Sequence, residues 1–117
     1  MPCIPRPRPP TLPPQRGGTR CHMPANKLND AEIEEALAGL DGWSRDGDEI
    51  VREVQLADFV AAMGLITQVG ILAERMNHHP TLTNTWNRVH IALSTHDVGG
   101  ISDYDMRLAA EINERVG

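Results

Sequence analysis

The sequence predicts one α+β domain, in which a small antiparallel sheet is covered by helices. Two observations lead to this fold class. Helix-like and strand-like segments follow one another in the order helix, hairpin, helix, strand, helix, and no segment repeats. A sharp change of composition after residue 22 divides the 117-residue chain into a short tail, residues 1–22, and a domain, residues 23–117.

The tail carries seven of the nine prolines, four arginines and no acidic residue. Such a segment buries too little apolar surface to offset the entropy of ordering, so we expect it to be extended or disordered. Composition is equally compatible with translation that begins at Met23, in which case the tail is upstream sequence. Both cysteines, Cys3 and Cys21, lie in the tail. The domain therefore has no disulfide framework, and we expect a cytoplasmic protein.

The domain is acidic. From Met23 onward, all 16 acidic residues stand against 7 basic ones, a net charge of −9. Nucleic-acid affinity depends mainly on clustered cations, so we expect no direct nucleic-acid partner. No apolar run reaches the roughly 18–20 residues of a membrane span, so we expect no membrane partner either.

The first helix and the hairpin are predicted from local signals. Residues 29–42 have a capping residue at Asn29 or Asp30, glycines at the end, and apolar residues at helical spacing: Ile33, Leu37 and Leu40. Residues 43–56 follow as a hairpin with Asp46-Gly47 as its turn.

Residues 58–76 predict a longer helix. We expect its buried stripe to consist of Phe59, Met63, Ile66, Val69 and Ala73, with a wider apolar flank of Val60, Leu65, Ile71 and Leu72. Two internal glycines, Gly64 and Gly70, each lower helix propensity by about 1 kcal/mol, and we expect them to allow close packing against the sheet.

Residues 81–95 are rich in β-branched side chains and form either one long edge strand or a hairpin that bends near Trp86-Asn87. The last segment, residues 102–116, predicts a helix that begins with a capping box of Ser102 and Asp105. Its buried stripe consists of Leu108, Ile112 and Val116.

Four of the five histidines fall within residues 78–96. His78 and His79 follow the second helix directly, where Pro80 ends it, and His96 follows the last strand. Histidine exchanges protons near neutral pH, so these three form a candidate acid–base site. His90 lies on the strand face opposite Val89, Ile91 and Leu93, so we expect it to be structural.

A metal site is the weaker alternative. It requires three or four converging ligands, and the rings of adjacent histidines diverge. The HExxH spacing is also absent, although one of His78 and His79 could join His90 and His96.

The segment ERMNHHPTLTNTWNRVHIALSTHDVGGISDYD, residues 74–105, resembles the pterin-4a-carbinolamine dehydratases. The resemblance rests on an acidic residue, HHP, an aromatic six residues after the proline, a strand that ends in STH, a glycine turn and an aspartate. It extends over about residues 27–115. One departure is that many relatives place bulky aromatic or histidine residues where this chain has Leu82 and Thr83, which implies a less stacked pocket.

The resemblance implies a four-stranded antiparallel sheet with about three helices on one face, and it favours the hairpin for residues 81–95. It implies dehydration of a 4a-hydroxytetrahydropterin without a metal or organic cofactor, in a homodimer or homotetramer. A non-catalytic dimerisation or assembly cofactor of the same fold is the alternative. The implied catalytic residues are His78, His79 and His96. The implied substrate contacts are Asn77, His78, His79, Ser94, Thr95, His96 and Asp97, with Glu74, Trp86 and Asp105 in support.

Overall fold

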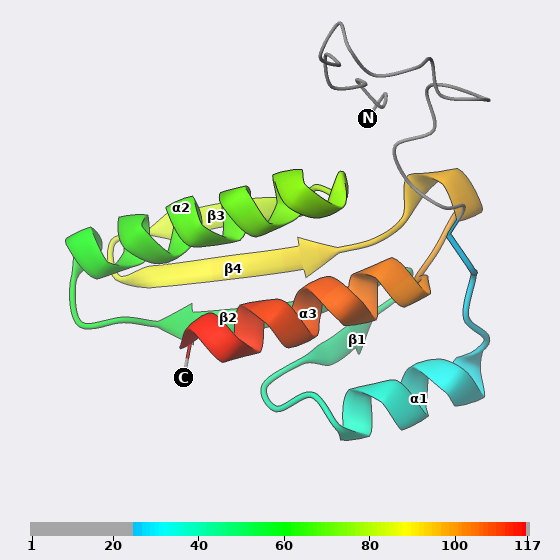
Figure 1. Ribbon diagram of the computed structural model, residues 1–117. Helices are drawn as coiled ribbons and strands as arrows, with labels where there is room; N and C mark the ends of the chain where they lie inside the picture. The colour runs from blue at the N-terminus through cyan, green and yellow to red at the C-terminus, as the bar shows by residue number, and fades with distance from the viewer. Residues whose placement is uncertain (1–24, 117) are drawn as a thin grey trace, which may run out of the picture.

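The computed structural model describes residues 25–116; the predicted tail lies outside this range. The elements are α1 (Asp30–Ala38), β1 (Ser44–Asp46), β2 (Glu49–Gln55), α2 (Phe59–Met76), β3 (Thr81–Thr85), β4 (Arg88–Leu93), the 3-10 helix η1 (His96–Val98) and α3 (Asp103–Val116). The strands form one antiparallel sheet in the order β1-β2-β4-β3, and the helices cover one of its faces (Figure 1). The predicted fold class is confirmed.

The predicted start of the first helix is confirmed in detail. The Asn29 side chain accepts a hydrogen bond from the Glu32 N–H (2.8 Å), and the Glu32 carboxylate accepts one from the Asn29 N–H (3.0 Å). The first hairpin turn was predicted one residue too early. Asp46 pairs with Glu49, so the two loop residues are Gly47 and Asp48. Gly47 has φ +62°, which a glycine at the first loop position adopts without strain.

The hairpin prediction for residues 81–95 is also confirmed. Thr85 pairs with Arg88, which leaves Trp86 and Asn87 as the turn. Trp86 adopts φ +48°, a left-handed conformation that is uncommon for a bulky residue. The Asn84 amide holds this turn, because it donates to the Trp86 carbonyl (3.1 Å) and the Arg88 carbonyl (2.9 Å).

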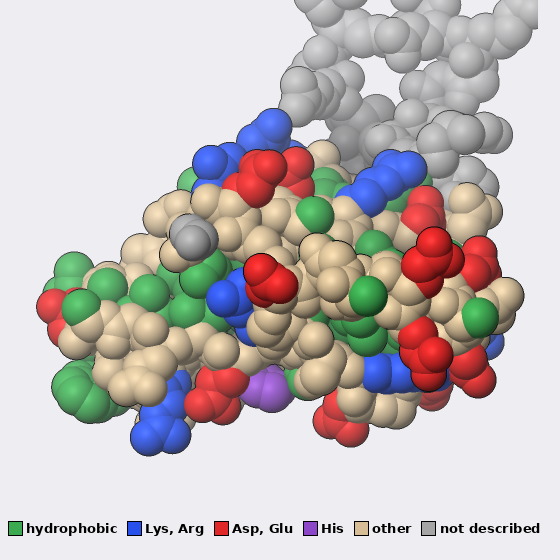
Figure 2. Space-filling model, turned by 90° about the horizontal axis from the view of Figure 1, so that it is seen from below, with side chains coloured by type: hydrophobic (Ala, Val, Ile, Leu, Met, Phe, Trp, Pro, Cys, Tyr) green, Lys and Arg blue, Asp and Glu red, His purple; other side chains and the backbone are tan. Residues whose placement is uncertain are grey.

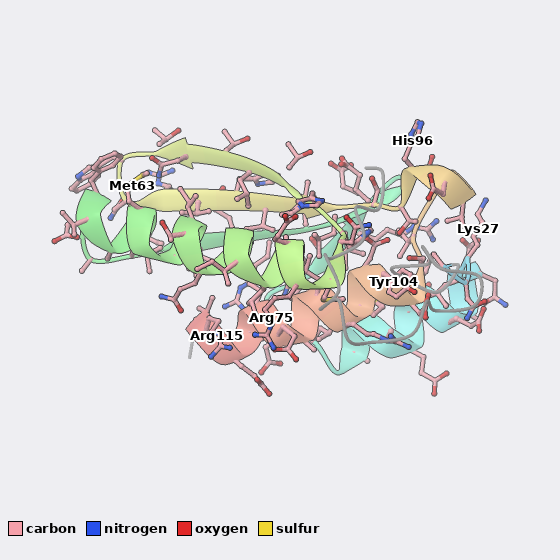
Figure 3. All side chains as sticks on the ribbon, turned by 45° about the horizontal axis from the view of Figure 1, so that its top comes forward. Lys27, Met63, Arg75, His96, Tyr104 and Arg115 are labelled. Atoms are coloured by element: carbon pink, nitrogen blue, oxygen red, sulfur yellow. The ribbon has the colours of Figure 1, made fainter. Side chains whose placement is uncertain are left out.

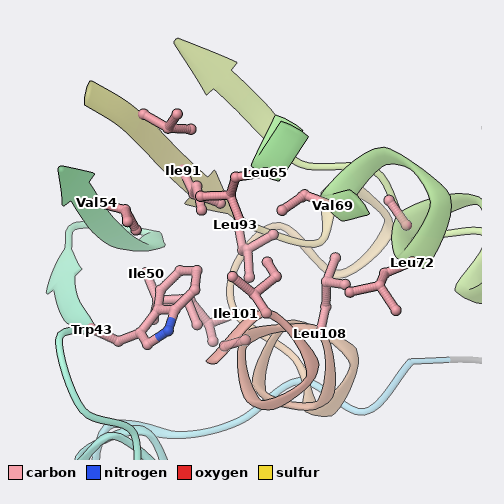
Figure 4. Packing of buried hydrophobic residues seen from close by; sticks show 14 of the residues in the cluster. Trp43, Ile50, Val54, Leu65, Val69, Leu72, Ile91, Leu93, Ile101 and Leu108 are labelled. Carbon is pink, nitrogen blue, oxygen red and sulfur yellow. The ribbon is translucent and has the colours of Figure 1, made fainter. Parts of the chain in front are cut away.

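The core lies between the sheet and the helices (Figure 4). Its buried side chains come from every layer and include Trp43, Ile50, Val54, Leu65, Val69, Leu72, Ile91, Leu93, Ile101 and Leu108. Trp43 also donates its indole N–H to the Asn113 side chain at 2.8 Å, which ties the chain before β1 to α3. Each large apolar side chain buried in this way contributes about 1.5–3 kcal/mol.

The buried face of α2 agrees with the predicted one at Val69 and Ala73 and differs from it toward the start of the helix. Its buried residues are Ala62, Leu65, Val69, Leu72 and Ala73. Phe59 and Met63, predicted to be buried, are 48% and 42% exposed. Gly64 and Gly70 face outward, where an added Cβ would meet nothing within 4 Å, so they do not serve close packing on the sheet. The prediction failed because α2 is apolar on both sides, and periodicity alone permits more than one stripe.

The prediction that no apolar segment is long enough to span a membrane was also wrong. At 18 residues and a mean hydropathy of 1.3, α2 is long and apolar enough to cross a membrane by those two criteria. Core helices of soluble proteins meet the same criteria, and α2 contributes five buried residues to the core.

Candidate active site

The three candidate histidines lie at one end of the sheet. β3 and β4 pair from Thr85–Arg88 to Thr81–Ala92. His78 and His79 come just before β3, and Ser94 and Thr95 come just after β4, so both pairs lie at the same end of this hairpin. His96 opens η1 just beyond β4, at the end of the molecule away from Met63 (Figure 3).

His78 is held by a buried carboxylate. α2 ends at Asn77, which adopts the left-handed conformation (φ 51°) of a helix C-cap and turns the chain toward β3. The His78 Nε2 lies 2.5 Å from Asp105 Oδ1. The side chain of His78 is 11% exposed and that of Asp105 is fully buried. Because a carboxylate only accepts hydrogen bonds, His78 carries its proton on Nε2 and donates it to Asp105.

A chain of hydroxyl groups fixes Asp105 from the other side. Its Oδ2 accepts from the Thr95 hydroxyl and from the Ser102 backbone N–H, both at 2.9 Å. The Thr95 oxygen then accepts from the Ser102 hydroxyl at 2.5 Å, and the Ser102 oxygen accepts from the Tyr104 N–H at 3.2 Å. Asp105 therefore caps α3, as the predicted capping box requires, and orients His78 with its second oxygen.

His79 and His96 are more accessible. His79 Nε2 lies 2.9 Å from the Glu74 carboxylate, and the two side chains are 33% and 74% exposed. The His96 ring makes no hydrogen bond or ion pair within residues 25–116, and it projects outward from η1 (Figure 3). Ser94 and Asp97, on either side of this turn, are also exposed. One ring is thus locked and two are open to a bound molecule.

Two of the implied site residues have other positions. Thr95 is only 6% exposed, and its hydroxyl belongs to the Asp105 network, so its side chain supports the site from behind. Trp86 lies in the β3–β4 turn, at the opposite end of β3 from His79 and about 23 Å from it along an extended chain of seven residues. The structure therefore does not bring Trp86 to the histidines of the same chain, because the hairpin carries it away from them.

Two residues near the histidines were missed as site residues. Ser102 was assigned only to capping, although its hydroxyl bonds Thr95. The Tyr104 ring lies 6.0 Å from the His78 ring, centroid to centroid. The sequence did carry a signal for both residues. Ser102 and Tyr104 lie within three residues of Asp105 at the start of the last helix, so they are expected to lie near whatever Asp105 contacts.

His90 occupies the predicted face of β4, opposite the buried Val89, Ile91 and Leu93. With Glu53, Thr83, Thr85 and Arg88 it lines a shallow hollow of about 260 Å³ on the uncovered face of the sheet. Within residues 25–116, no three histidine, cysteine, aspartate or glutamate side chains are grouped so that they could hold a metal ion.

Known families and structures include relatives of this chain. Residues 26–115 match the family described as "Pterin 4 alpha carbinolamine dehydratase". A protein of Roseiflexus castenholzii, provisionally named a pterin-4-alpha-carbinolamine dehydratase, is 48% identical over 74% of this chain and 94% of its own length. A Brucella ovis protein with the same provisional name is 39% identical over 81% and 100%. A crystal structure from Brucella melitensis, described as a transcriptional coactivator/pterin dehydratase, superposes with a TM-score of 0.76 and 36% identity over 79% and 100%.

Proposed function

This chain belongs to the pterin-4α-carbinolamine dehydratase family, and from that premise we propose that it removes water from a 4a-hydroxytetrahydropterin. The observation that carries the proposal is the set of three histidines at one end of the sheet, one bound to buried Asp105 and two accessible. The protein is accordingly a hydro-lyase, and the product is a quinonoid dihydropterin.

The reaction needs two proton transfers. An acid gives a proton to the hydroxyl on C4a, which leaves as water. A base takes the proton from N5, and the electrons of that N–H bond form the C4a=N5 double bond. Two imidazoles, one protonated and one neutral, supply both steps, and each transfer by a positioned group typically contributes about 10²–10⁴-fold in rate.

We assign the proton transfers to His79 and His96 and the positioning of the pterin to His78. The assignment is supported by accessibility, since His79 is 33% exposed and His96 is exposed. Glu74 sets the orientation of His79 by accepting from its Nε2. Asp105 holds the Nε2 of His78 and so fixes the tautomer of the ring. The other ring nitrogen is then left in one defined state toward a bound pterin, which suits a positioning role. Ser94 and Asp97 are also exposed, and Asn77 caps α2 directly before His78, which supports them as substrate contacts.

The test is to generate a 4a-hydroxytetrahydropterin in situ and follow its dehydration by absorbance. We expect His79→Ala and His96→Ala each to lower kcat/KM by at least about tenfold. His90→Ala is the matched control, because it removes a histidine from the uncovered face of the sheet. A wild-type rate equal to the spontaneous one, or two site variants as active as wild type, would refute the assignment.

We further propose that the chain forms a homodimer or homotetramer through the outer face of α2. This face, which we call the α2 outer face, comprises Phe59, Val60, Met63 and Ile71, which are 42–77% exposed. No charged residue lies between Phe59 and Ala73. The domain as a whole is acidic, and Figure 2 shows Asp and Glu side chains spread over the face seen from below, with Lys and Arg side chains between them. Copies of an acidic domain meet with least repulsion where charge is absent.

The same face supports a second, non-catalytic role, in line with the coactivator description of the Brucella melitensis neighbour. Light scattering after size-exclusion chromatography tests the self-association. Met63→Glu and Ile71→Glu should lower the mass toward the monomer, whereas Ala110→Glu, a new charge at an exposed position of α3, should not. A monomeric wild type, or an unchanged mass in both face variants, would refute the proposal.

A further inference from the structure

This protein has few aromatic side chains, and most of them lie far from the histidines. The whole chain has two tryptophans, one tyrosine and one phenylalanine, and all four lie within the described residues. Trp43 is buried in the core. Phe59 begins α2, about 26 Å along that helix from its end beside His78, and Trp86 lies in the distant β3–β4 turn. Tyr104 is therefore the one aromatic ring of the chain beside its own histidine site.

Tyr104 lies against His78. Their ring centroids are 6.0 Å apart and their planes are tilted by 41°. This arrangement is within the usual range for attractive contacts between flat rings. It follows from the chain itself, because Tyr104 immediately precedes Asp105 in the first turn of α3. The carboxylate thus fixes a nitrogen of the imidazole, and the phenol ring limits its tilt.

Arg107 fixes the tyrosine in turn. Its guanidinium carbon lies 5.4 Å from the centroid of the Tyr104 ring, within reach of a cation–π contact. The same guanidinium lies 3.6 Å from the Asp103 carboxylate, one helical turn earlier. Tyr104 is half-buried, so its ring is oriented by neighbours without being enclosed in the core.

We propose that Tyr104, held by Arg107, is the aromatic wall of the pterin site, and this inference rests on the proposed function. A pterin is a flat bicyclic heteroaromatic ring, and sites for such ligands are lined mainly by apolar and aromatic side chains. The residues of β3 that follow Pro80, Leu82 and Thr83 among them, offer no aromatic ring. Tyr104 supplies one from α3 instead, and it sets the tilt of His78 against the bound ring.

The kinetic test compares Tyr104→Leu with Tyr104→Phe. Loss of one aromatic contact should raise KM about two- to tenfold and leave kcat within about twofold, while phenylalanine should restore KM. Arg107→Gln, which leaves the ring but frees its orientation, should give a smaller rise. A purely structural role would lower the melting temperature without this separation of KM from kcat. Wild-type KM in Tyr104→Leu, in an enzyme that still dehydrates, would refute the aromatic wall and leave the proposed function standing.

A second measurement does not depend on turnover. Because the chain has a single tyrosine, 3-fluorotyrosine gives one ¹⁹F resonance that reports on Tyr104 alone. Titration with a 7,8-dihydropterin, which lacks the 4a-hydroxyl and cannot be dehydrated, should shift this resonance saturably. The 5-fluorotryptophan resonance of buried Trp43 is the internal control and should not move. A ligand that shifts the histidine signals but not the tyrosine would overturn the inference. If the ligand shifted none of these signals, the proposed pterin site itself would be refuted, together with the role of Tyr104 in it.

Discussion

Replacing Asp105 tests both the stability and the chemistry that the buried network provides. The fully buried carboxylate accepts from His78, Thr95 and Ser102. In Asp105→Ala the Thr95 hydroxyl can turn to Ser102 Oγ, which already lies at 2.5 Å. The Ser102 N–H and the His78 ring then lose their acceptor. At about 1–3 kcal/mol for each buried donor left unpaired, the free energy of unfolding should fall by about 2–6 kcal/mol.

Asp105→Asn separates the two effects. The asparagine oxygen can still accept from Ser102 and Thr95, so the free energy of unfolding should fall by only about 1 kcal/mol. Its NH₂ group, however, faces the His78 Nε2 and requires that nitrogen to accept, which forces the other tautomer. We therefore expect kcat to fall by about 10- to 100-fold in a nearly native protein.

Denaturant unfolding followed by the fluorescence of buried Trp43 gives the stabilities, and the dehydration assay gives kcat. Asp105→Ala within about 1 kcal/mol of wild type would refute the account of the network, since the unpaired donors would cost nothing. Asp105→Asn with wild-type kcat would show that Asp105 does not set the state of His78.

Three further predictions concern single positions. Asn29→Ala removes the side-chain half of the α1 capping box and should lower the free energy of unfolding by about 1 kcal/mol in urea titrations. Gly64→Ala and Gly70→Ala add a methyl group that meets nothing on an exposed helix face, so each should raise it by about 0.5–1 kcal/mol in monomer at high dilution; a decrease would contradict the outward placement. Trp86→Gly relieves a left-handed conformation far from the histidines, so kcat/KM should stay within about twofold of wild type. A larger loss of kcat/KM would show that Trp86 does contribute to the active site.

The elements whose formation depends on local chemistry could be predicted from the sequence. Asn29 and Glu32 cap α1 through neighbouring atoms, and Ser102 and Asp105 do the same for α3. The position of Gly47 predicted a hairpin but not its register, because either Asp46 or Asp48 can share the loop with it. Only the pairing of Asp46 with Glu49 selects one of these.

Features that depend on distant contacts could not be predicted in this way. α2 is apolar on more than one side, and packing on the sheet buries Leu65 and Leu72 instead of Phe59 and Met63. The histidine cluster was found from spacing alone. The contact between Tyr104 and His78 was not, because Tyr104 reaches His78 only after α3 docks beside the end of α2.

The segment Asn26–Leu28 pairs with the strand-like stretch that leads into α3. Leu28 N–H donates to the Ile101 carbonyl at 2.9 Å, and Asn26 N–H donates to the Asp103 carboxylate at 2.9 Å. Any polypeptide joined ahead of residue 26 thus enters the fold beside the loop that carries Ser102. The other end of the described chain leaves α3 at the far side of the molecule (Figure 1). Affinity tags and fluorescent fusions are therefore best attached after residue 117, where their bulk lies away from substrate entry.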